Sequence, residues 1–520
     1  MGTVTTGAST TFTVSEGQIV NLTADAGTIG KVTWTAMNGL SRSDNIGPPA
    51  TDIDYGPWVH EVELTIQSTR GTMTYTVTGD YVVKAQTDPV TGGITISAGG
   101  KVTSGGFGAT ILRASALHKP YGTSDVSFNK GSGLSSAAIT TCVKAVVNSA
   151  FTAARIVSTN RGTATPTGVK ALLSVTETMA TNTSNNLAQA VIGGTAYAAL
   201  AGATNQLGQR AVTWAGAATM THGASSAAGP DLKLSDWQPI KAVPRTDGGT
   251  GYAYFRKVYR DGAAGNWAFT TLVNTPADSA ANRNRPVVVS NYFGDGVGTI
   301  SNTYSLTSTS DDCAVEFRFQ VPVLSVWGAG DSTMSCVGLV TDRASSWLHR
   351  ACEDVSIDGI PVVHANFGAA GTTSSDYLTN VSAYLAAGVT PPSVLFVSIS
   401  VNEIGSTPDV RKAETCIKTI SDAAEICREY GIPYLACVPI LPNENIANST
   451  LDTIRKQINT DAEAVCASLG VGFLNLSALG DGAAKELYIP AYKFDAVHPN
   501  EAGIEAVIVP AATAVLRAVI

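Results

Sequence analysis

Hydrophobic and polar residues alternate in short runs over the first hundred residues. The runs TTFTVSEG, KVTWTAMN and TMTYTVTGDYVVKA keep a period of two, and Gly, Asp or Asn interrupts the pattern between them. Such alternation is typical of antiparallel strands joined by turns. We therefore predict an all-β domain over residues 1–108, which ends in the turn-forming SGGFG of residues 104–108.

Residues 109–319 continue with short apolar runs and predict a second β domain, interpreted as a sandwich. VKALLSVTETM, YAYFRKVYR and AVEFRFQV favour strands, whereas VKAVVNSAFTAARIV fits either a helix or a strand. Aromatic residues gather in this segment and fit either a core or a platform for sugar rings. They are Trp214, Trp237, Tyr252, Tyr254, Phe255, Tyr259 and Trp267.

After residue 320 the pattern changes to an alternation of strands and helices. Nearly continuous apolar runs, typical of strands covered on both faces, occupy residues 321–328, 360–368, 392–400, 432–440 and 471–479. The segment from Val410 to Cys427 keeps the helical period, and Gly431 ends it. The chain is thus expected to be multidomain, with an α/β domain over residues 320–520 built on a parallel sheet.

Composition and charge exclude several partners. Only 14% of residues are charged, and 33 Lys and Arg against 41 Asp and Glu give a net charge of −8. Nucleic-acid binding needs a basic surface, so no nucleic-acid partner is expected. No apolar run approaches the roughly 18 residues of a membrane span, so no membrane insertion is expected. The start of the chain shows no secretory leader.

Cysteine and histidine spacing predicts neither a metal nor a cofactor. The eight cysteines lack CxxC spacing and lie mostly in apolar patterns, which indicates buried reduced thiols. His364 lies inside an apolar run and is interpreted as a core residue. His349 is interpreted as part of a solvated helix face, and His222 has no partner motif in the sequence.

The loops that follow the apolar runs hold the candidate chemistry, because ligands bind at the carboxyl ends of parallel strands. These loops contain Ser332 in GAGDSTMS, the glycine-rich NFGAAGTTSS, the amide of VNEIGS, and Asp495 with His498 in FDAVHP. A hydroxyl, a base, a carboxylate and hydrogen-bond donors are what nucleophilic acyl chemistry needs. Ser332 alone could simply cap a helix, but the DAVHP block favours catalysis.

These blocks make residues 320–520 resemble the SGNH (GDSL) hydrolase superfamily. GDS at residues 330–332 matches its first block, Gly371 its second, Asn402 of VNE its GxND block, and DAVHP at residues 495–499 its DxxHP block. The resemblance implies a flavodoxin-like, three-layer α/β fold. The chain departs from the pattern at two positions that do no chemistry in the family, Ser400 and Glu403.

The same resemblance implies a role for each matched residue. Ser332 would attack an ester carbonyl, His498 would transfer the protons, and Asp495 would orient the imidazole. The oxyanion hole would consist of the backbone N–H groups of Ser332 and Gly371 and the side-chain amide of Asn402. All four blocks lie between residues 330 and 499, so we expect the chemistry to lie wholly in the α/β domain.

The expected function is a carboxylic ester hydrolase that acts on an acetylated polysaccharide. The opening segment resembles the Thr- and Gly-rich β modules of bacteriophage tail and tailspike proteins. A tailspike that deacetylates host capsule or O-antigen would form a homotrimer in the virion tail and act outside the cell. Two alternatives stay open: a secreted bacterial acetylesterase, with a carbohydrate-binding β region and a leader outside this chain, or a glycan adhesin without catalysis.

Overall fold

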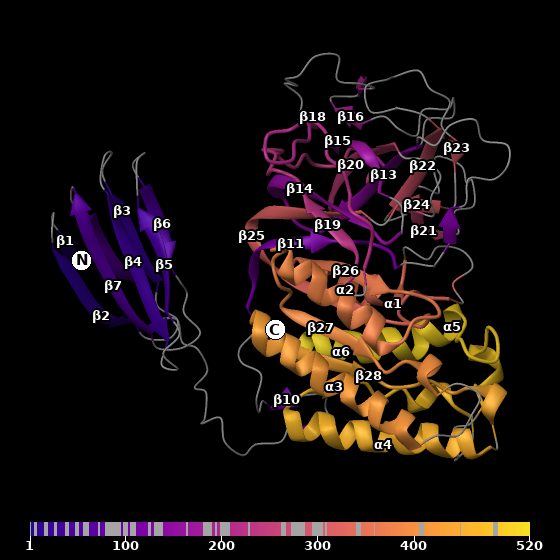
Figure 1. Cartoon of the computed structure of the whole chain (residues 1–520). Coiled ribbons are helices and arrows are strands. Elements are labelled where there is room, and N and C mark those ends of the chain that lie inside the picture. The colour runs from indigo at the N-terminus through magenta and orange to yellow at the C-terminus, as the bar shows by residue number, and fades with distance from the viewer. Residues whose placement is uncertain are drawn as a thin grey trace. The chain divides into compact units, whose positions relative to one another are not determined.

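The structure is a computed structural model of the chain, in which two compact units, Met1–Thr91 and Gly92–Ile520, are distinguished (Figure 1). Apart from isolated strands elsewhere, the described residues are 111–179, 209–261 and 313–520. Short gaps interrupt them at residues 123–125, 129–138, 163–164, 227–228, 338, 340–344, 358, 405–409, 448 and 482–486. The predicted turn at residues 104–108 lies outside the described residues.

The first unit contains two antiparallel sheets of four strands each, in the orders β1-β8-β3-β6 and β2-β7-β4-β5. Leu22, Val32 and Ile66 have no exposed surface. The strands are β1 Gly2–Val4, β2 Ser9–Val14, β3 Ile19–Ala24, β4 Ile29–Ala36, β5 Ser41–Ile46, β6 Thr51–Tyr55, β7 Val62–Arg70 and β8 Met73–Thr78. For the rest of residues 1–108, the all-β domain stays a prediction.

One long strand, β25 (Ala314–Gly330), is the centre of the eight-stranded sheet of the second unit. Its first half pairs antiparallel with β11 (Arg113–His118) and β14 (Phe151–Asn160). Its second half pairs parallel with β26 (Val362–Gly368) and β27 (Val394–Ser398). The sheet is completed by β19 Asp231–Leu234, β28 Tyr434–Val438 and β29 Gly472–Phe473.

The predicted boundary at residue 320 falls inside β25, so the two apolar runs on either side of it form one strand. The register with β11 jumps from Arg318 to Val323, and the pairing with β26 begins at Leu324. Pro322 lies where the partners change, and its missing N–H therefore breaks no ladder hydrogen bond. Gln320, Val321 and Pro322 are exposed.

A six-stranded antiparallel sheet, in the order β18-β15-β20-β13-β22-β23, packs on the antiparallel half of the large sheet through residues such as Val143, Leu173 and Phe317. Its strands are β13 Ile139–Val147, β15 Thr167–Thr176, β18 Gln209–Ala211, β20 Tyr252–Asp261, β22 Val287–Phe293 and β23 Ser305–Leu306. The run that fitted a helix or a strand forms β13 and β14. The remaining short strands are β9 Thr95–Ile96, β10 Val102–Thr103, β12 Val126–Phe128, β16 Ala190–Ile192, β17 Thr195–Tyr197, β21 Trp267–Thr271 and β24 Thr309–Asp311.

The aromatic residues of this region divide by burial. Four of them, Trp214, Tyr254, Phe255 and Tyr259, are buried and belong to the interior rather than to a sugar platform. Trp237 is half-buried and lies under the guanidinium groups of Arg155 and Arg318, whose central carbons are 4.8 Å and 4.3 Å from its ring centre. The core interpretation therefore holds for these four.

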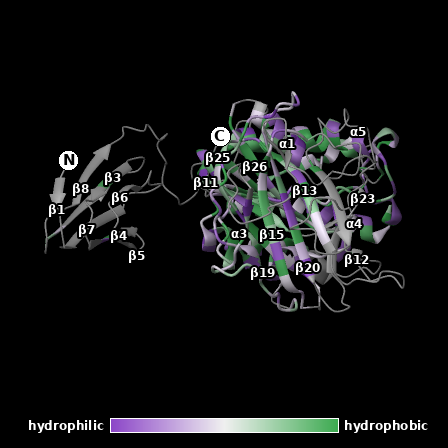
Figure 2. Cartoon of the chain, turned by 90° about the horizontal axis from the view of Figure 1, so that it is seen from above, coloured by the Kyte–Doolittle hydropathy of each residue, from purple (hydrophilic) through white to green (hydrophobic). Residues whose placement is uncertain are grey.

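Helices cover both faces of the parallel half of the sheet, as predicted for residues 320–520 (Figure 1). On one face lie α1 (Trp347–Ile357) and α6 (Val509–Ala518), and on the other lie α2 (Ser374–Ala386), α3 (Val410–Tyr430) and α4 (Thr450–Leu469). Alternate residues of β25 separate the two cores: Val326 faces α1 and α6, whereas Trp327 faces the other three helices. Figure 2 shows hydrophobic residues along β25 and β26. The C-terminal domain is thus a mixed sheet with parallel strands and helices on both sides.

All eight cysteines are described, buried and free of disulfides, as predicted. Within the described part of the chain, no helix is long and apolar enough to cross a membrane.

Candidate active site

Ser332 lies in a tight turn immediately after β25. The turn is closed by hydrogen bonds from the Ser335 N–H to the Asp331 carbonyl and from the Val337 N–H to the Ser332 carbonyl, both 3.0 Å long. Cys336 adopts a left-handed conformation, with φ of 57°, which is unfavourable for a residue with a side chain. The turn is thus a strained structure that depends on its surroundings.

The structure brings together the three residues predicted to form the triad. His498 Nε2 lies 2.8 Å from Ser332 Oγ, across a sequence separation of 166 residues. His498 Nδ1 lies 2.8 Å and 3.0 Å from the two carboxylate oxygens of Asp495. Ser332 keeps 7% of its surface exposed, and the hydrogen bond with His498 orients its hydroxyl.

Asp495 is held as a carboxylate by its own loop. Partial burial favours its neutral form, but hydrogen bonds from the His498 ring and from the Val497 and His498 N–H groups outweigh this effect, so the pKa of Asp495 lies below its ordinary value. The two backbone N–H groups donate to Oδ1 at 2.7 Å. The carboxylate is therefore ionised at neutral pH and available to the imidazole.

The predicted oxyanion residues Gly371 and Asn402 come from neighbouring loops that hydrogen bonds join. Asn402, in the short 3-10 helix η2 (Val401–Glu403) after β27, donates from Nδ2 to the Thr372 carbonyl at 2.9 Å. Gly371 has a φ of 80°, which favours glycine, and a Cβ there would meet nothing within 4 Å, so conformation rather than space selects glycine. The Asn402 amide carries a second N–H, which can serve a ligand.

Asp331, next to Ser332, connects the nucleophile turn to the Asn402 loop. Its carboxylate accepts hydrogen bonds at 3.0 Å from the N–H groups of Thr333 and Val401. Burial raises the pKa of Asp331, against the effect of these hydrogen bonds. The hydrogen bonds to His498 Nδ1 come from Asp495, so Asp331 serves to join the two loops.

The two departures from the family pattern reinforce the same loops. The Ser400 hydroxyl lies 2.9 Å from the Thr372 carbonyl and 3.3 Å from Asp331 Oδ2. Glu403 accepts hydrogen bonds from the backbone N–H, at 2.9 Å, and the hydroxyl of Ser374 at the start of α2. The sequence analysis missed this network, although the departures themselves marked the positions.

A second group missed by the sequence analysis holds the loop of Asp495 and His498. The Glu444 N–H donates to the Ala496 carbonyl at 2.8 Å, and its carboxylate pairs with Lys493. The Tyr488 hydroxyl donates to the Val497 carbonyl at 2.6 Å. No motif reveals these contacts, because Glu444 follows another strand, β28.

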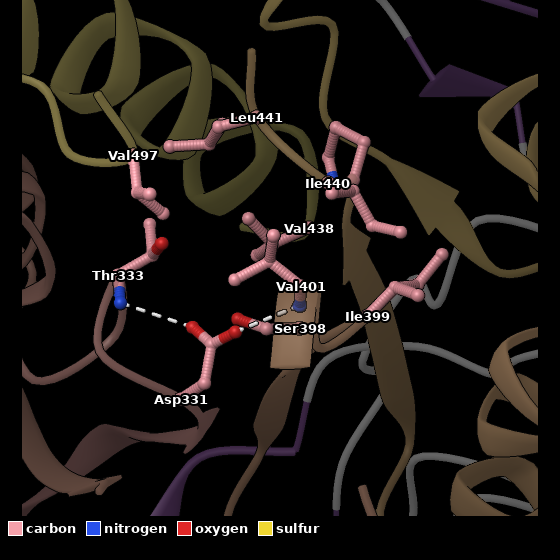
Figure 3. Close-up of a pocket in the computed structure, with 10 residues that line it drawn as sticks. Asp331, Thr333, Ser398, Ile399, Val401, Val438, Ile440, Leu441 and Val497 are labelled. Carbon is pink, nitrogen blue, oxygen red and sulfur yellow. Dashed lines mark hydrogen bonds between the residues drawn. The ribbon is translucent and has the colours of Figure 1, made fainter. Parts of the chain in front are cut away.

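A small, mostly apolar pocket adjoins the site (Figure 3). Thr333, Val401 and Val497, each the sequence neighbour of a predicted site residue, form part of its wall. The remaining lining residues are Asp331, Ser398, Ile399, Val438, Pro439, Ile440 and Leu441. The pocket admits a group about the size of one water molecule.

His222, which has no partner motif in the sequence, has two partners in the fold. It lies 2.9 Å from Ser158 Oγ and 2.7 Å from Asp231 Oδ2, because the fold brings β14 and β19 beside its loop. This is a second Ser–His–Asp constellation, but Ser158 has no exposed surface. No substrate can reach it, so it is a buried structural network.

His349 is not part of a solvated face. Its ring packs at 5.2 Å from that of His364, and its side chain is only 14% exposed. His364 is buried, as expected for a core residue. The helix α1 lies on β26 here, and the helical period of the sequence does not reveal this contact. Among the described residues, no group of three or more His, Cys, Asp or Glu side chains is arranged to hold a metal.

Residues 329–506 match the GDSL-like Lipase/Acylhydrolase family. No curated protein matches the chain. Among solved structures, a member of the lipolytic protein G-D-S-L family from Veillonella parvula is 19% identical, with 37% of this chain and 96% of that chain covered and a TM-score of 0.30.

Two further structures are similar to the same extent. A GDSL-like lipase from Bacteroides thetaiotaomicron is 18% identical over 36% of this chain and 87% of its own, with a TM-score of 0.28. An acetyl xylan esterase from Geobacillus stearothermophilus is 16% identical over 38% of this chain and 94% of its own, with a TM-score of 0.29. Likeness at this level carries no information on substrate. From the family match, the C-terminal part of this chain, residues 329–506, is a GDSL-like lipase/acylhydrolase domain.

Proposed function

We propose that this protein is a serine esterase that removes O-acetyl groups from a polysaccharide. The observation that carries the proposal is the hydrogen-bonded chain from Ser332 through His498 to Asp495 within an acylhydrolase domain. In such a chain the imidazole accepts the serine proton, and the carboxylate stabilises the imidazolium that forms.

The proposed reaction proceeds in two acyl transfers. Ser332 Oγ attacks the ester carbonyl while His498 Nε2 takes the hydroxyl proton, and the tetrahedral oxyanion is stabilised by the N–H groups of Ser332, Gly371 and Asn402. The intermediate collapses to an acyl-enzyme, and the proton on His498 passes to the leaving sugar hydroxyl. Water then attacks the acyl carbonyl with His498 as base, which releases acetate and restores Ser332.

The pocket beside the triad supports a short acyl group. Its apolar wall, which includes Val401 and Val497, suits a methyl group. Acetyl esters should therefore be preferred over esters of longer acids. The ratio of kcat/KM for p-nitrophenyl acetate to that for p-nitrophenyl octanoate measures this preference, and a ratio below one would contradict it.

Two features support a polysaccharide as the substrate. Only 14% of the residues are charged, and the net charge is −8, so the chain does not offer the basic surface that a polyphosphate or nucleic acid requires. Large sheets accompany the hydrolase fold in the second unit and supply surface beyond that needed for chemistry alone.

The test is acetate release from a panel of O-acetylated bacterial and plant polysaccharides. The proposal predicts release from at least one polymer by the full chain and none by the Ser332→Ala variant. The same polymers, deacetylated beforehand with alkali, serve as controls. Absence of release from every polymer, together with hydrolysis of long-chain lipid esters, would overturn the proposed substrate class.

The tailspike interpretation belongs to the same proposal. It is supported by the resemblance of the opening segment to phage tail modules, and it adds a homotrimer located in the virion tail. Light scattering coupled to size-exclusion chromatography measures the oligomeric mass directly. Three times the 53.5 kDa chain mass is the expected result, and a monomer at micromolar concentration would contradict it.

A further inference from the structure

We propose that residues 118–122, which lie before the hydrolase domain in sequence, position the nucleophile turn, with Lys119 as the central positioning residue. This inference rests on the proposed function, because it concerns the rate of the same acyl transfer. It changes the expectation that the chemistry lies wholly in residues 320–520.

The path of the chain brings this segment to the active site. After β11, Lys119 joins the free edge of β26: its N–H donates to the His364 carbonyl at 3.1 Å, and its own carbonyl accepts from the Asn366 N–H at 2.8 Å. The pairing with Ala365 is parallel, like that of the catalytic strands. A segment from the β region thus extends the sheet of the hydrolase domain.

The Lys119 side chain is fully buried and links its own segment to β26 of that domain. Its ammonium group donates to the carbonyls of Asn366, at 3.0 Å, and Tyr121, at 3.1 Å, and lies 5.8 Å from the centre of the Phe367 ring. A buried ammonium group costs free energy that an apolar side chain of similar length would avoid. Its presence is therefore better explained by what it holds in place than by stability.

Asn366 connects Lys119 to the nucleophile turn. The side chain of this buried residue donates to the Met334 carbonyl at 3.0 Å and accepts from the Gly368 N–H at 2.8 Å. Met334 lies two residues after Ser332, in the turn strained by Cys336. The path from the Lys119 ammonium to the nucleophile therefore consists of Asn366 and the turn itself.

Gly122 fixes the other end of the segment against the same turn. A Cβ on Gly122 would lie 2.6 Å from the Gly368 carbonyl oxygen and 2.9 Å from Ser335 Cα, so only glycine permits this approach. Tyr121 is anchored to the six-stranded sheet, since Arg256 donates to its hydroxyl at 3.0 Å. The nucleophile turn thus rests on a segment fixed by both sheets.

The central test compares Lys119→Met with Lys144→Met. Lys144 is also buried, but it lies on β13, where its ammonium donates to the Thr178 carbonyl at 3.4 Å. We expect Lys119→Met to lower kcat for p-nitrophenyl acetate by about 10- to 100-fold with KM changed less than about threefold, since small displacements of reacting groups cost this much. The kcat of Lys144→Met should stay within about twofold of wild type, even if its melting temperature falls as much as that of Lys119→Met.

A double mutant separates positioning from general destabilisation. Asn366→Asp removes the donor to Met334 and should lower kcat by a similar factor. The double mutant with Lys119→Met should lose no more kcat than the more impaired single mutant, because both residues act on the nucleophile turn through the same contacts. Wild-type kcat in a folded Lys119→Met variant, equal losses in both lysine variants, or additive losses in the double mutant would overturn the proposal.

Two further controls keep the test decisive. If Lys119→Met does not fold, Tyr121→Phe loosens the segment while leaving Lys119 in place; a several-fold loss of kcat is expected, and an unchanged kcat would overturn the proposal.

If the wild-type protein itself has no esterase activity that Ser332→Ala removes, the proposed function fails. The rate at which a fluorophosphonate labels Ser332, followed by mass spectrometry, then tests the positioning separately, and equal rates in wild type and Lys119→Met would refute it.

Discussion

Ser332 lies 2.8 Å from His498 Nε2, and Ser158 lies 2.9 Å from His222 Nε2, so hydrogen-bond geometry alone does not distinguish the two serines. Exposure does, because Ser158 is fully buried. Ser158→Ala should leave esterase activity within about twofold of wild type but reduce the free energy of unfolding by about 1–3 kcal/mol, since a buried ring nitrogen loses its partner. Urea denaturation and an esterase assay on the same preparation check both outcomes.

At the same scale, Asn402 is expected to contribute through its side-chain amide. Asn402→Ala should lower kcat by about 10²–10³-fold, the usual effect of one oxyanion donor. Ser400→Gly is the matched control, because it removes the hydrogen bonds of the Ser400 hydroxyl in the same loop but keeps the Asn402 amide. Its loss of kcat should stay within about tenfold. Steady-state kinetics with p-nitrophenyl acetate decides, and equal losses in the two variants would mean that Asn402 only shapes the loop.

At the scale of elements, β25 decides which fragment of the chain can fold. A fragment of residues 320–520 cuts this strand and lacks residues 118–122, whereas the unit Gly92–Ile520 keeps both. We expect the longer fragment to hydrolyse p-nitrophenyl acetate at the full-length rate and the shorter one to be unfolded or at least 10-fold slower, as a misplaced nucleophile implies. Circular dichroism and kinetics on both fragments test this. A folded 320–520 fragment with full activity would contradict it.

The same strand shows what the sequence can and cannot predict. Apolar runs predict the parallel strands and their helices because burial on both faces leaves a local signal. Ser332, Asp495 and His498 follow from the motif blocks at the strand ends. The continuity of β25 through Pro322 and the pairing of Lys119 with β26 leave no such signal, since they depend on strands that are distant along the chain. Glu444 and Ser158 were missed because the fold alone brings them to Lys493 and His222, which are 49 and 64 residues away.

At the scale of the whole molecule, buried neutral histidines make stability depend on pH. Burial is the main cause that lowers the pKa of His118 to about 3 and the pKa values of His222 and His349 to about 4. In the unfolded chain, histidine has a pKa of about 6.5, so between pH 6.5 and 4 the unfolded state binds more protons than the folded state. Stability is therefore fully present above pH 6.5 and falls on acidification.

Each of these histidines contributes a slope of up to about 1.4 kcal/mol per pH unit in that window. Urea denaturation at pH 7, 6 and 5 should show a falling free energy of unfolding. His222→Gln should reduce the slope of this free energy against pH by the contribution of one histidine, up to about 1.4 kcal/mol per pH unit. A free energy of unfolding that is unchanged or higher at pH 5 would contradict the assignment of these histidines as buried and neutral.

We propose that Ser332, rather than any other group of the chain, is the nucleophile of an esterase. The most direct measurement is the steady-state hydrolysis of p-nitrophenyl acetate by the full-length protein and its Ser332→Ala and Ser158→Ala variants, with folding checked by circular dichroism. We expect turnover by the wild type and Ser158→Ala, and a loss of about 10⁴- to 10⁶-fold in Ser332→Ala, since triad members act as a unit. Turnover by Ser332→Ala near the wild-type rate would contradict it.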